Sequence, residues 1–434
     1  MDYRQTLDYL YSSTPVFEHV GAKAYKPGLQ TSMALDGRYG HPHRNFKIVH
    51  VAGTNGKGSC SHTIAAILQA EGHRVGLYTS PHLVDFKERI KVNGECIEEN
   101  YVTDFVERDM DFFESLRPSF FELATALAFK YFSDKHVDIA VIEVGLGGRL
   151  DCTNIVTPIL SVITNISKDH TLQLGDTLQD IAGEKAGIIK KGVPVVIGES
   201  DIVTRPVFEQ KAREMSATAV FAEDTPEIVS AVTRSDGKIM YETRHYGSIC
   251  AELNGDYQVK NANTILHAVD LLAAMGLVSG RDSVCKGFGD VCRTTGIMGR
   301  WQKLQDRPLV ICDTGHNVGG WQYLSRQIAM QPCKTLRIVF GMVDDKDIRQ
   351  VLTMLPRHAV CYFTNASTHR AIPSAKVAQY AASCGLHGSC HASVSKAYMA
   401  ALVDASADDF VFVGGSSYVV ADLLLFLEDR IKSF

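Results

Sequence analysis

A glycine-rich turn that contains a lysine is the part of the chain best suited to chemistry. It follows an apolar run, residues 47–52, and precedes a helix-like segment, residues 60–69. Glycines let backbone N–H groups converge on phosphate oxygens, a helix N-terminus adds partial positive charge, and Lys57 can reach the outer phosphates. The glycines lie closer together than in the common phosphate loop, and a purely structural turn is the alternative. We expect a nucleoside triphosphate here, bound by Gly53, Thr54, Asn55, Gly56, Lys57, Gly58 and Ser59.

Acidic residues and a histidine follow two later apolar runs. Glu143 lies near the end of the run 137–144, and a carboxylate there is costly unless it is paired or bound to a metal. We interpret Glu143 as a magnesium ligand, with a salt bridge to Arg149 as the alternative. Asp169 and His170 follow the next run and are expected at the same sheet edge. Chemistry alone leaves His170 evenly balanced between metal ligand and hydrogen-bonding group, because magnesium prefers oxygen.

A further lysine lies in a segment with small residues on one side. Residues 181–189 read as a helix close to the expected phosphate site, and Lys185 is placed to face the nucleotide. A solvated lysine paired with a nearby acid is the alternative.

Polar residues also end two apolar runs near the C-terminus. Asp313 and His316 follow residues 309–312 and are suited to orienting an amine nucleophile. The alternative is that Asn317 only caps the next helix and His316 packs locally. Residues 414–417 lie between an apolar run and a helix, a geometry suited to holding a carboxylate.

Composition limits the classes of function. The chain has 434 residues, 45% hydrophobic and 21% charged, which indicates a globular protein of two domains. A net charge of -5 without a basic run predicts no nucleic-acid partner. The N-terminus lacks a signal-peptide pattern and no apolar stretch is long enough to span a membrane, so we expect a cytoplasmic protein with no membrane partner. The 11 scattered cysteines suggest neither a disulfide framework nor a zinc site.

The elements that must position these residues alternate between strands and helices. Such alternation predicts a doubly wound α/β sheet, interrupted by an antiparallel hairpin with an Asp-Gly turn at residues 236–237. Helical patterns follow, and then a short connector at residues 294–299. A second, smaller α/β domain comes next, so we expect domains at residues 1–297 and 298–434. The predicted strands are 74–78, 137–144, 159–164 and 193–197 in the first domain, and 309–312, 336–340, 360–363 and 410–413 in the second.

Taken together and in order, these motifs resemble the folylpolyglutamate synthase and dihydrofolate synthase family, relatives of the Mur ligases. The resemblance runs through nearly the whole chain. It implies a P-loop ATPase-like N-terminal domain of the Mur ligase central-domain type, followed by a smaller Rossmann-like glutamate ligase domain, with ATP held across the cleft between them. The matching stretches are 53–59, 80–83, 120–122, 143–151, 169–170, 184–187, 299–301, 313–317 and 415–416.

The resemblance also implies roles for individual residues. Lys57 matches the phosphate lysine, and Lys185 matches a lysine that family members can carry as a carbamate able to hold a second magnesium. The residues matching the family's magnesium ligands are Ser80, Glu143 and His170. Those matching groups around the phosphates and the incoming glutamate are Arg300, Asp313, His316 and Ser416. The substrate-side residues are Ser80, Pro81, His82 and Leu83, and the stretch from Tyr9 to Gly28 resembles parts of the family that border the pteridine-bearing substrate.

The reaction implied by the resemblance is ATP-dependent formation of an amide. A carboxylate of dihydropteroate or of a reduced folate attacks the ATP γ-phosphate, and the α-amine of L-glutamate attacks the resulting acyl phosphate. We expect ATP, two Mg²⁺ ions, a monovalent cation as a further candidate, and a monomer. The alternatives are a dihydrofolate synthase that does not extend folates, another Mur-type amino-acid ligase, a kinase, and a nucleotide-gated binding protein.

Overall fold

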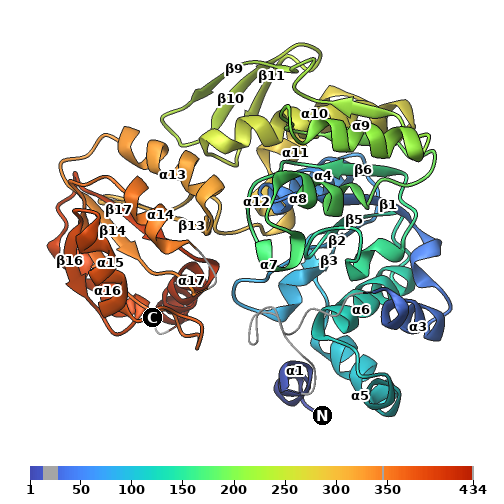
Figure 1. Cartoon of the computed structure of the whole chain (residues 1–434), viewed down its shortest axis with the longest axis horizontal. Coiled ribbons are helices and arrows are strands. Elements are labelled where there is room, and N and C mark those ends of the chain that lie inside the picture. Colours follow the sequence, from blue (N-terminus) through green and yellow to red (C-terminus); the bar gives the residue numbers. More distant parts are fainter. Residues whose placement is uncertain (13–27, 345–346, 433–434) are drawn as a thin grey trace. The chain divides into compact units, whose positions relative to one another are not determined.

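The computed structural model describes residues 1–12, 28–344 and 347–432 (Figure 1). These residues form two compact units. The first unit contains Met1–Glu252 and Gln258–Ile297. The second unit contains Leu253–Tyr257 and Met298–Phe434. Among the described residues, no helix is both long and apolar enough to cross a membrane.

The first unit is built on an eight-stranded sheet in the order β4-β3-β2-β5-β1-β6-β7-β8. The predicted α/β fold is therefore confirmed, with all pairs parallel except those that involve β3 and β4. Its central strands are buried on both faces, which explains why they read as continuous apolar runs. The strands are β1 (Lys47–Ala52), β2 (Val75–Tyr78), β3 (Ile90–Val92), β4 (Glu95–Cys96), β5 (Ile139–Glu143), β6 (Leu160–Ile163), β7 (Val195–Ile197) and β8 (Ala219–Phe221).

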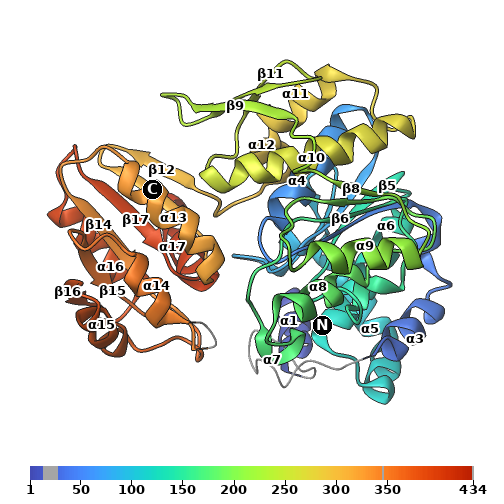
Figure 2. The same ribbon diagram turned by 45° about the horizontal axis from the view of Figure 1, so that its top comes forward.

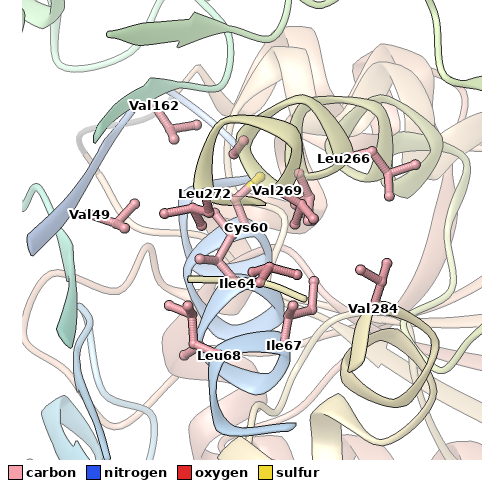
Figure 3. Close-up of a cluster of buried hydrophobic side chains, with 14 of the residues drawn as sticks. Val49, Cys60, Ile64, Ile67, Leu68, Val162, Leu266, Val269, Leu272 and Val284 are labelled. Atoms are coloured by element: carbon pink, nitrogen blue, oxygen red, sulfur yellow. The ribbon is translucent and has the colours of Figure 1, made fainter. Parts of the chain in front are cut away.

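One face of this sheet is covered by the helix that follows the glycine turn. Figure 3 shows Cys60, Ile64 and Leu68 of α4 (Lys57–Ala70) beside Val49 of β1 and Val162 of β6. The same cluster takes in apolar side chains of α10 (Asp256–Ala274) and α11 (Arg281–Gly289). Burial of α4 between strands and helices fixes the start of the helix, and with it the glycine turn.

The opposite face carries an aromatic-rich core under α5 (Glu99–Leu116) and α6 (Phe120–Asp134). A capping box begins α6, because the Ser119 side chain accepts from the backbone N–H of Glu122 and Glu122 bonds back to Ser119. Other helices of the unit are α1 (Tyr3–Ser12), α3 (Gln30–Arg38), η2 (Pro42–Asn45), η3 (Phe86–Arg89), η4 (Cys152–Ile155), α7 (Thr171–Leu174), α8 (Leu178–Ala186), α9 (Arg205–Glu214) and α12 (Val291–Thr295).

A small antiparallel sheet adjoins α10 and α11 in the first unit, and both views show it (Figures 1 and 2). The predicted hairpin is confirmed as β9 (Ile228–Thr233) and β10 (Ile239–Thr243). A third strand, β11 (Ser248–Ala251), completes the sheet and was not predicted. The expected connector at residues 294–299 needs correction, because its first two residues complete α12.

The second unit is a six-stranded sheet in the order β12-β13-β17-β14-β15-β16. It is parallel except for β12, and the four predicted strands are confirmed. The edge strands β12 and β16 are polar and were missed. The strands are β12 (Gln302–Asp306), β13 (Leu309–Asp313), β14 (Leu336–Phe340), β15 (Val360–Phe363), β16 (His387–Cys390) and β17 (Phe410–Gly414). The helices are α13 (Val318–Met330), α14 (Ile348–Met354), α15 (Ser374–Ser383), α16 (Val394–Asp404) and α17 (Ser417–Lys432).

Candidate active site

The glycine turn of the first unit forms a rigid cradle at the carboxyl end of β1. Gly53 and Gly56 adopt positive φ angles of 149° and 83°, which side chains rarely allow. The loop after β6 is hydrogen-bonded to this turn. Thr54 N donates to the Asn165 carbonyl at 2.9 Å, and Asn55 N donates to Asn165 Oδ1 at 3.0 Å. The backbone shape needed for an anion is therefore set by bonds within the unit.

The cradle lysine and the cradle serine lie in different surroundings. Lys57 Nζ donates to the carbonyl oxygens of Gly53 and Thr54, each at 3.2 Å, so it folds back over the turn. Ser59 is 1% exposed, and its hydroxyl accepts a bond from Gln258 Nε2 at 3.1 Å. Ser59 was predicted to bind nucleotide. That assignment stays a prediction, and the bond from Gln258 also ties the first turn of α4 to α10.

Glu143 ends β5 beside the strand that enters the cradle. The parallel register pairs it with Val51, and its side chain is 3% exposed. Glu143 Oε2 accepts the Ser80 backbone N–H at 3.1 Å, which joins two of the predicted metal ligands. The alternative from the sequence was a salt bridge between Glu143 and Arg149. Arg149 instead forms an ion pair with Glu184, with Nη2 and Oε1 2.7 Å apart. A buried carboxylate next to a phosphate cradle is consistent with a hard cation.

Asp169 and His170 follow β6, at the same sheet edge. His170 has a φ of 49°, and its Nε2 lies 3.8 Å from Asp169 Oδ1. Among the described residues, no group of three or more histidine, cysteine, aspartate or glutamate side chains could hold a metal ion. The assignment of Ser80, Glu143 and His170 as magnesium ligands stays a prediction.

Lys185 lies on α8, which ends at Ala186 rather than reaching residue 189 as predicted. The side chain is 3% exposed, and its Nζ donates to the Gly53 carbonyl oxygen at 2.9 Å. Burial is the main cause that lowers the pKa of Lys185, and the positive charge of Lys57 adds to it. The resulting pKa is about 7, although Asp169 and other acids oppose the shift. Lys185 therefore contacts the glycine turn, and its facing a nucleotide stays a prediction.

A buried network that the sequence did not reveal supports the glycine loop after Glu143. His50 on β1 is fully buried, and its Nε2 lies 2.9 Å from Thr153 Oγ1. Thr153 Oγ1 donates to Asp151 Oδ1 at 2.5 Å, while Asp151 Oδ2 accepts the Leu146 backbone N–H at 2.8 Å. Burial lowers the pKa of His50 to about 3, so this imidazole is neutral. The sequence feature that could have indicated this network is a histidine inside an apolar strand.

Two amide side chains also contact the cradle without having been predicted. Asn165 accepts hydrogen bonds from the backbone N–H groups of Thr54 and Asn55. Asn261 of α10 lies so close to Gly56 that a side chain there would meet its Oδ1. Polar residues on the helix and loop that border the cradle were the signal that could have identified both.

The segment from Ser80 to Leu83 leads into an aromatic cluster. His82 Nδ1 accepts from Arg89 Nε at 2.7 Å, and the Arg89 guanidinium lies 5.0 Å from the centre of the Phe120 ring. The Tyr11 ring stacks on Phe120 at 5.2 Å. Of the stretch from Tyr9 to Gly28 that was predicted to border the pteridine, residues 13–27 lie outside the described residues.

In the second unit, Asp313 ends β13 and is 3% exposed. Its Oδ2 accepts from Tyr257 Oη at 2.8 Å and from Trp301 N at 2.7 Å, and its Oδ1 accepts from Gly315 N at 2.8 Å. Burial raises the pKa of Asp313, against the opposing effect of Arg300 and these bonds. This carboxylate joins the backbone at Trp301 to the backbone at Gly315, so the geometry favours a role in positioning these loops over a role in proton transfer.

The remaining predicted residues of the second unit surround the same sheet edge. Arg300 Nη1 donates to Thr314 Oγ1. His316 Nδ1 lies 3.1 Å from the Thr314 carbonyl oxygen, and Asn317 caps α13 by accepting from Gly320 N. Ser416 is 2% exposed and its Oγ accepts the Val419 N–H at 3.2 Å, which caps α17. Asn317 therefore caps α13, as the alternative had it, while the role of His316 stays a prediction.

Comparisons with known proteins agree with this architecture. The Mur ligase middle domain matches residues 51–269, and the Mur ligase glutamate ligase domain matches residues 299–417. A Bacillus subtilis protein named dihydrofolate synthase/folylpolyglutamate synthase is 35% identical over 346 residues, which cover 76% of this chain and 79% of that protein. This chain spans about half the length of two longer relatives, 49% and 50%, from Halobacterium salinarum and Haloferax volcanii.

Solved structures extend the similarity to nearly the whole chain. The structure of E. coli FolC in complex with DHPP and ADP has a TM-score of 0.83 and 30% identity, covering 99% of this chain and 98% of that one. The bifunctional folylpolyglutamate synthase/dihydrofolate synthase from Yersinia pestis, complexed with AMPPNP and a Mn ion, has a TM-score of 0.81 and 28% identity, with coverage of 99% and 98%. The chain therefore belongs to the dihydrofolate synthase/folylpolyglutamate synthase family of ATP-dependent glutamate ligases, within the Mur ligases.

Proposed function

We propose that this chain uses ATP to attach L-glutamate to dihydropteroate and to reduced folates. The observation that carries the proposal is the convergence of Lys57 and Lys185 on the Gly53 carbonyl, while Glu143 ends the neighbouring strand. Two lysines and a buried acid around a glycine cradle suit a triphosphate with its metal ion. The DHPP and ADP bound by the E. coli relative support the choice of acceptor and nucleotide.

The proposed reaction has two steps. A carboxylate oxygen of the acceptor attacks the γ-phosphorus of ATP, the bond to the bridging oxygen breaks, and ADP leaves with that electron pair. The α-amine of glutamate then attacks the carbonyl carbon of the acyl phosphate. Inorganic phosphate leaves with its electron pair, and the amine loses a proton. Lys57 is proposed to neutralise charge on the phosphate oxygens in the first step, which requires it to swing away from the backbone carbonyls that it contacts.

Ser80, Glu143 and His170 would hold Mg²⁺ in this proposal. The donor set fits, because Glu143 is a buried carboxylate already joined to Ser80, and the three residues come from the carboxyl ends of β2, β5 and β6 in one sheet. When bound, the metal would neutralise charge on the phosphate oxygens. The Mn ion in the Yersinia pestis relative supports a divalent cation. A monovalent cation is a further candidate for the site. Comparing the activity in buffer that contains potassium ions with the activity in buffer that contains a bulky organic cation tests whether one is needed.

Lys185 is proposed to carry a carbamate, which would supply a carboxylate for a second Mg²⁺. Its neutral amine would attack carbon dioxide and lose a proton. A pKa of about 7 supports this step, because a large fraction of the amine is neutral at physiological pH. Electron density in a crystal with bound nucleotide tests it, and a ¹³C signal after exposure to labelled bicarbonate tests it in solution. An unmodified Lys185 in both would contradict the proposal.

The second unit is proposed to bind glutamate. His316 would orient the α-amine and accept its proton, while Asp313 would hold the loops that carry Arg300 and His316. Ser416 and the start of α17 would receive a carboxylate. Arg300 would bind phosphate oxygens. We also propose that the protein acts as a cytoplasmic monomer, for which light scattering should give a mass near 47.6 kDa.

The experiment that tests the function measures phosphate release with ATP, Mg²⁺ and L-glutamate. Dihydropteroate is compared with tetrahydrofolate, and products are identified by mass. Glutamate added to both acceptors supports the proposal. Addition to dihydropteroate alone would restrict it to a dihydrofolate synthase. A phosphorylated final product would indicate a kinase. If glutamate is added to neither acceptor, the folate assignment is wrong.

A further inference from the structure

The chain leaves the first unit for the last time just after α12, at Ile297. The last residue of this short helix, Thr295, is fully buried. Gly296 follows it in a left-handed conformation, with a φ of 64°, and ends the helix. The end of α12 therefore sets the point from which the chain continues toward Arg300.

A lysine from an antiparallel strand of the sheet holds this end of α12. Lys91 belongs to β3, and its side chain is 4% exposed. Its Nζ donates to the Thr295 carbonyl oxygen at 2.7 Å and to the Gly296 carbonyl oxygen at 3.4 Å. Carbonyl oxygens at the end of a helix have no partner within it, so a cation there is favourable. Burial lowers the pKa of Lys91, although Cys96 and Glu88 oppose the shift.

Two further groups contact the same helix end. His62 of α4 is buried, and its Nδ1 lies 2.8 Å from Thr295 Oγ1. Because Thr295 Oγ1 donates to the Val291 carbonyl oxygen at 2.7 Å, it accepts from His62. Gly94, between β3 and β4, approaches so closely that a side chain there would meet the Thr294 carbonyl oxygen. The end of α12 is therefore held both by the helix that follows the glycine turn and by the β3–β4 hairpin.

The start of α12 is tied to an earlier exit of the chain from the first unit. This unit is interrupted after Glu252, because residues 253–257 belong to the second unit. Glu252 Oε2 accepts the Cys292 backbone N–H at 2.7 Å, and Glu252 N donates to the Phe288 carbonyl oxygen at 3.0 Å. One short helix therefore supports both places at which the chain leaves the first unit.

Bonds within the second unit fix the other end of the last connection. The Gly299 carbonyl oxygen accepts from Thr314 N at 3.0 Å, and Gly299 N donates to Gln302 Oε1 at 2.8 Å. Residues 296–298 alone separate Gly299 from the anchored end of α12. Three residues span at most about 11 Å when fully extended, so a displacement of that end is passed on to Arg300 with little room for adjustment.

We propose that Lys91 is a positioning residue of the ligase, which fixes the end of α12 and with it the start of the connection to Arg300. The inference rests on the proposed function, in which glutamate held by the second unit must reach the acyl phosphate. An acyl phosphate that waits is exposed to water. Water attacks the carbonyl carbon and loses a proton, phosphate leaves with the bonding electron pair, and the acceptor carboxylate is restored. A displaced helix end should therefore uncouple ATP consumption from ligation.

The test measures the ratio of phosphate released to glutamate adduct formed, after subtraction of the phosphate released without acceptor. Coupled turnover gives equal amounts of the two products. Lys91→Met keeps the length of the side chain and removes its charge. In this variant the ratio should rise at least about threefold, and amide formation should slow about tenfold. A merely structural role would lower the fraction of active protein and leave the ratio unchanged.

A second variant covers the case in which circular dichroism shows that Lys91→Met does not fold. Thr295→Val keeps the shape of the side chain and removes the hydroxyl that accepts from His62, so the ratio should rise at least about twofold. Lys130→Met is the matched control, because Lys130 pairs with Asp134 on α6 at 2.5 Å, and it should leave the ratio unchanged.

The outcomes separate the inference from the function on which it rests. A folded Lys91→Met with the wild-type ratio overturns the inference. If that variant does not fold, a wild-type ratio in Thr295→Val overturns it instead. If the wild type itself forms no glutamate adduct, the proposed function fails.

Discussion

Replacement of Lys185 by methionine should stabilise the first unit while abolishing activity. The wild-type protein must keep an amine in a buried position, and the pKa of that amine falls from 10.5 to about 7. Each pKa unit corresponds to about 1.4 kcal/mol, so at pH 7 the burial costs about 4 kcal/mol relative to an exposed lysine. Methionine fills a similar volume without charge but forfeits the bond from Nζ to Gly53 O, which offsets about 1 to 2 kcal/mol. We expect a net gain of about 2 kcal/mol.

The dependence of this gain on pH identifies its cause. Between about pH 7 and the pKa of an unfolded lysine, the unfolded chain binds more protons at Lys185 than the folded chain does. The stability of the wild type therefore rises with pH in this window, by up to about 1.4 kcal/mol per pH unit, whereas Lys185→Met lacks that contribution. The advantage of the variant should shrink by about 2 kcal/mol between about pH 7.5 and pH 9.

The assay is urea denaturation in buffers freed of carbon dioxide, so that no carbamate forms. Far-UV circular dichroism follows the whole chain. Both tryptophans, Trp301 and Trp321, belong to the second unit, so their fluorescence provides an internal control that Lys185→Met should leave unchanged. A stability difference that does not change with pH, or a variant less stable than the wild type at pH 7, would refute the argument from burial.

Three further changes test other parts of the two units. Lys57→Met should raise the pKa of Lys185, because the positive charge of Lys57 contributes to lowering it. The rise of stability with pH should then begin at a higher pH than in the wild type. ATP turnover should fall at least about 100-fold. Asp313→Asn should lower the stability of the second unit by about 2 to 3 kcal/mol, measured by tryptophan fluorescence, because an amide cannot accept from all three donors. Since burial lowers the pKa of His50 to about 3, the wild type should lose stability as pH falls below about 6.5, whereas His50→Gln should lose about 2 kcal/mol less by about pH 4.5; parallel acid titrations of both would contradict this.

The sequence predicted the strands that are buried on both faces and missed the ones at the edges. β6 and β14 read as short apolar runs because helices cover both of their faces. β12 and β16 hold polar and small residues, and they become strands only because a neighbouring strand offers hydrogen bonds. Helix α8 ended early at Ala186, before Gly187, although the apolar pattern continued into residues 188–189.

At the site, residue types were predictable and their burial was not. Lys185 was placed near the nucleotide by its motif, but a lysine on a helix is solvated more often than buried. Its low pKa comes from the fold, which packs α8 against the glycine loop: Arg149 N donates to the Glu184 carbonyl oxygen at 2.8 Å. The network from His50 to Asp151 depends on contacts between residues about a hundred positions apart, which no local pattern contains.

An acid at the end of a buried strand recurs in both units, and we propose a different role for each. Glu143 and Asp313 each end a buried strand, and each is 3% exposed. Asp313 accepts bonds from three donors of its own unit, so its charge is already compensated and its loss should first affect stability. Glu143 accepts the backbone N–H of Ser80, a residue of the loop that follows β2 at the same edge. We therefore propose that Asp313 organises loops of the second unit, and that Glu143, at the end of the strand beside β1, is placed to meet a cation.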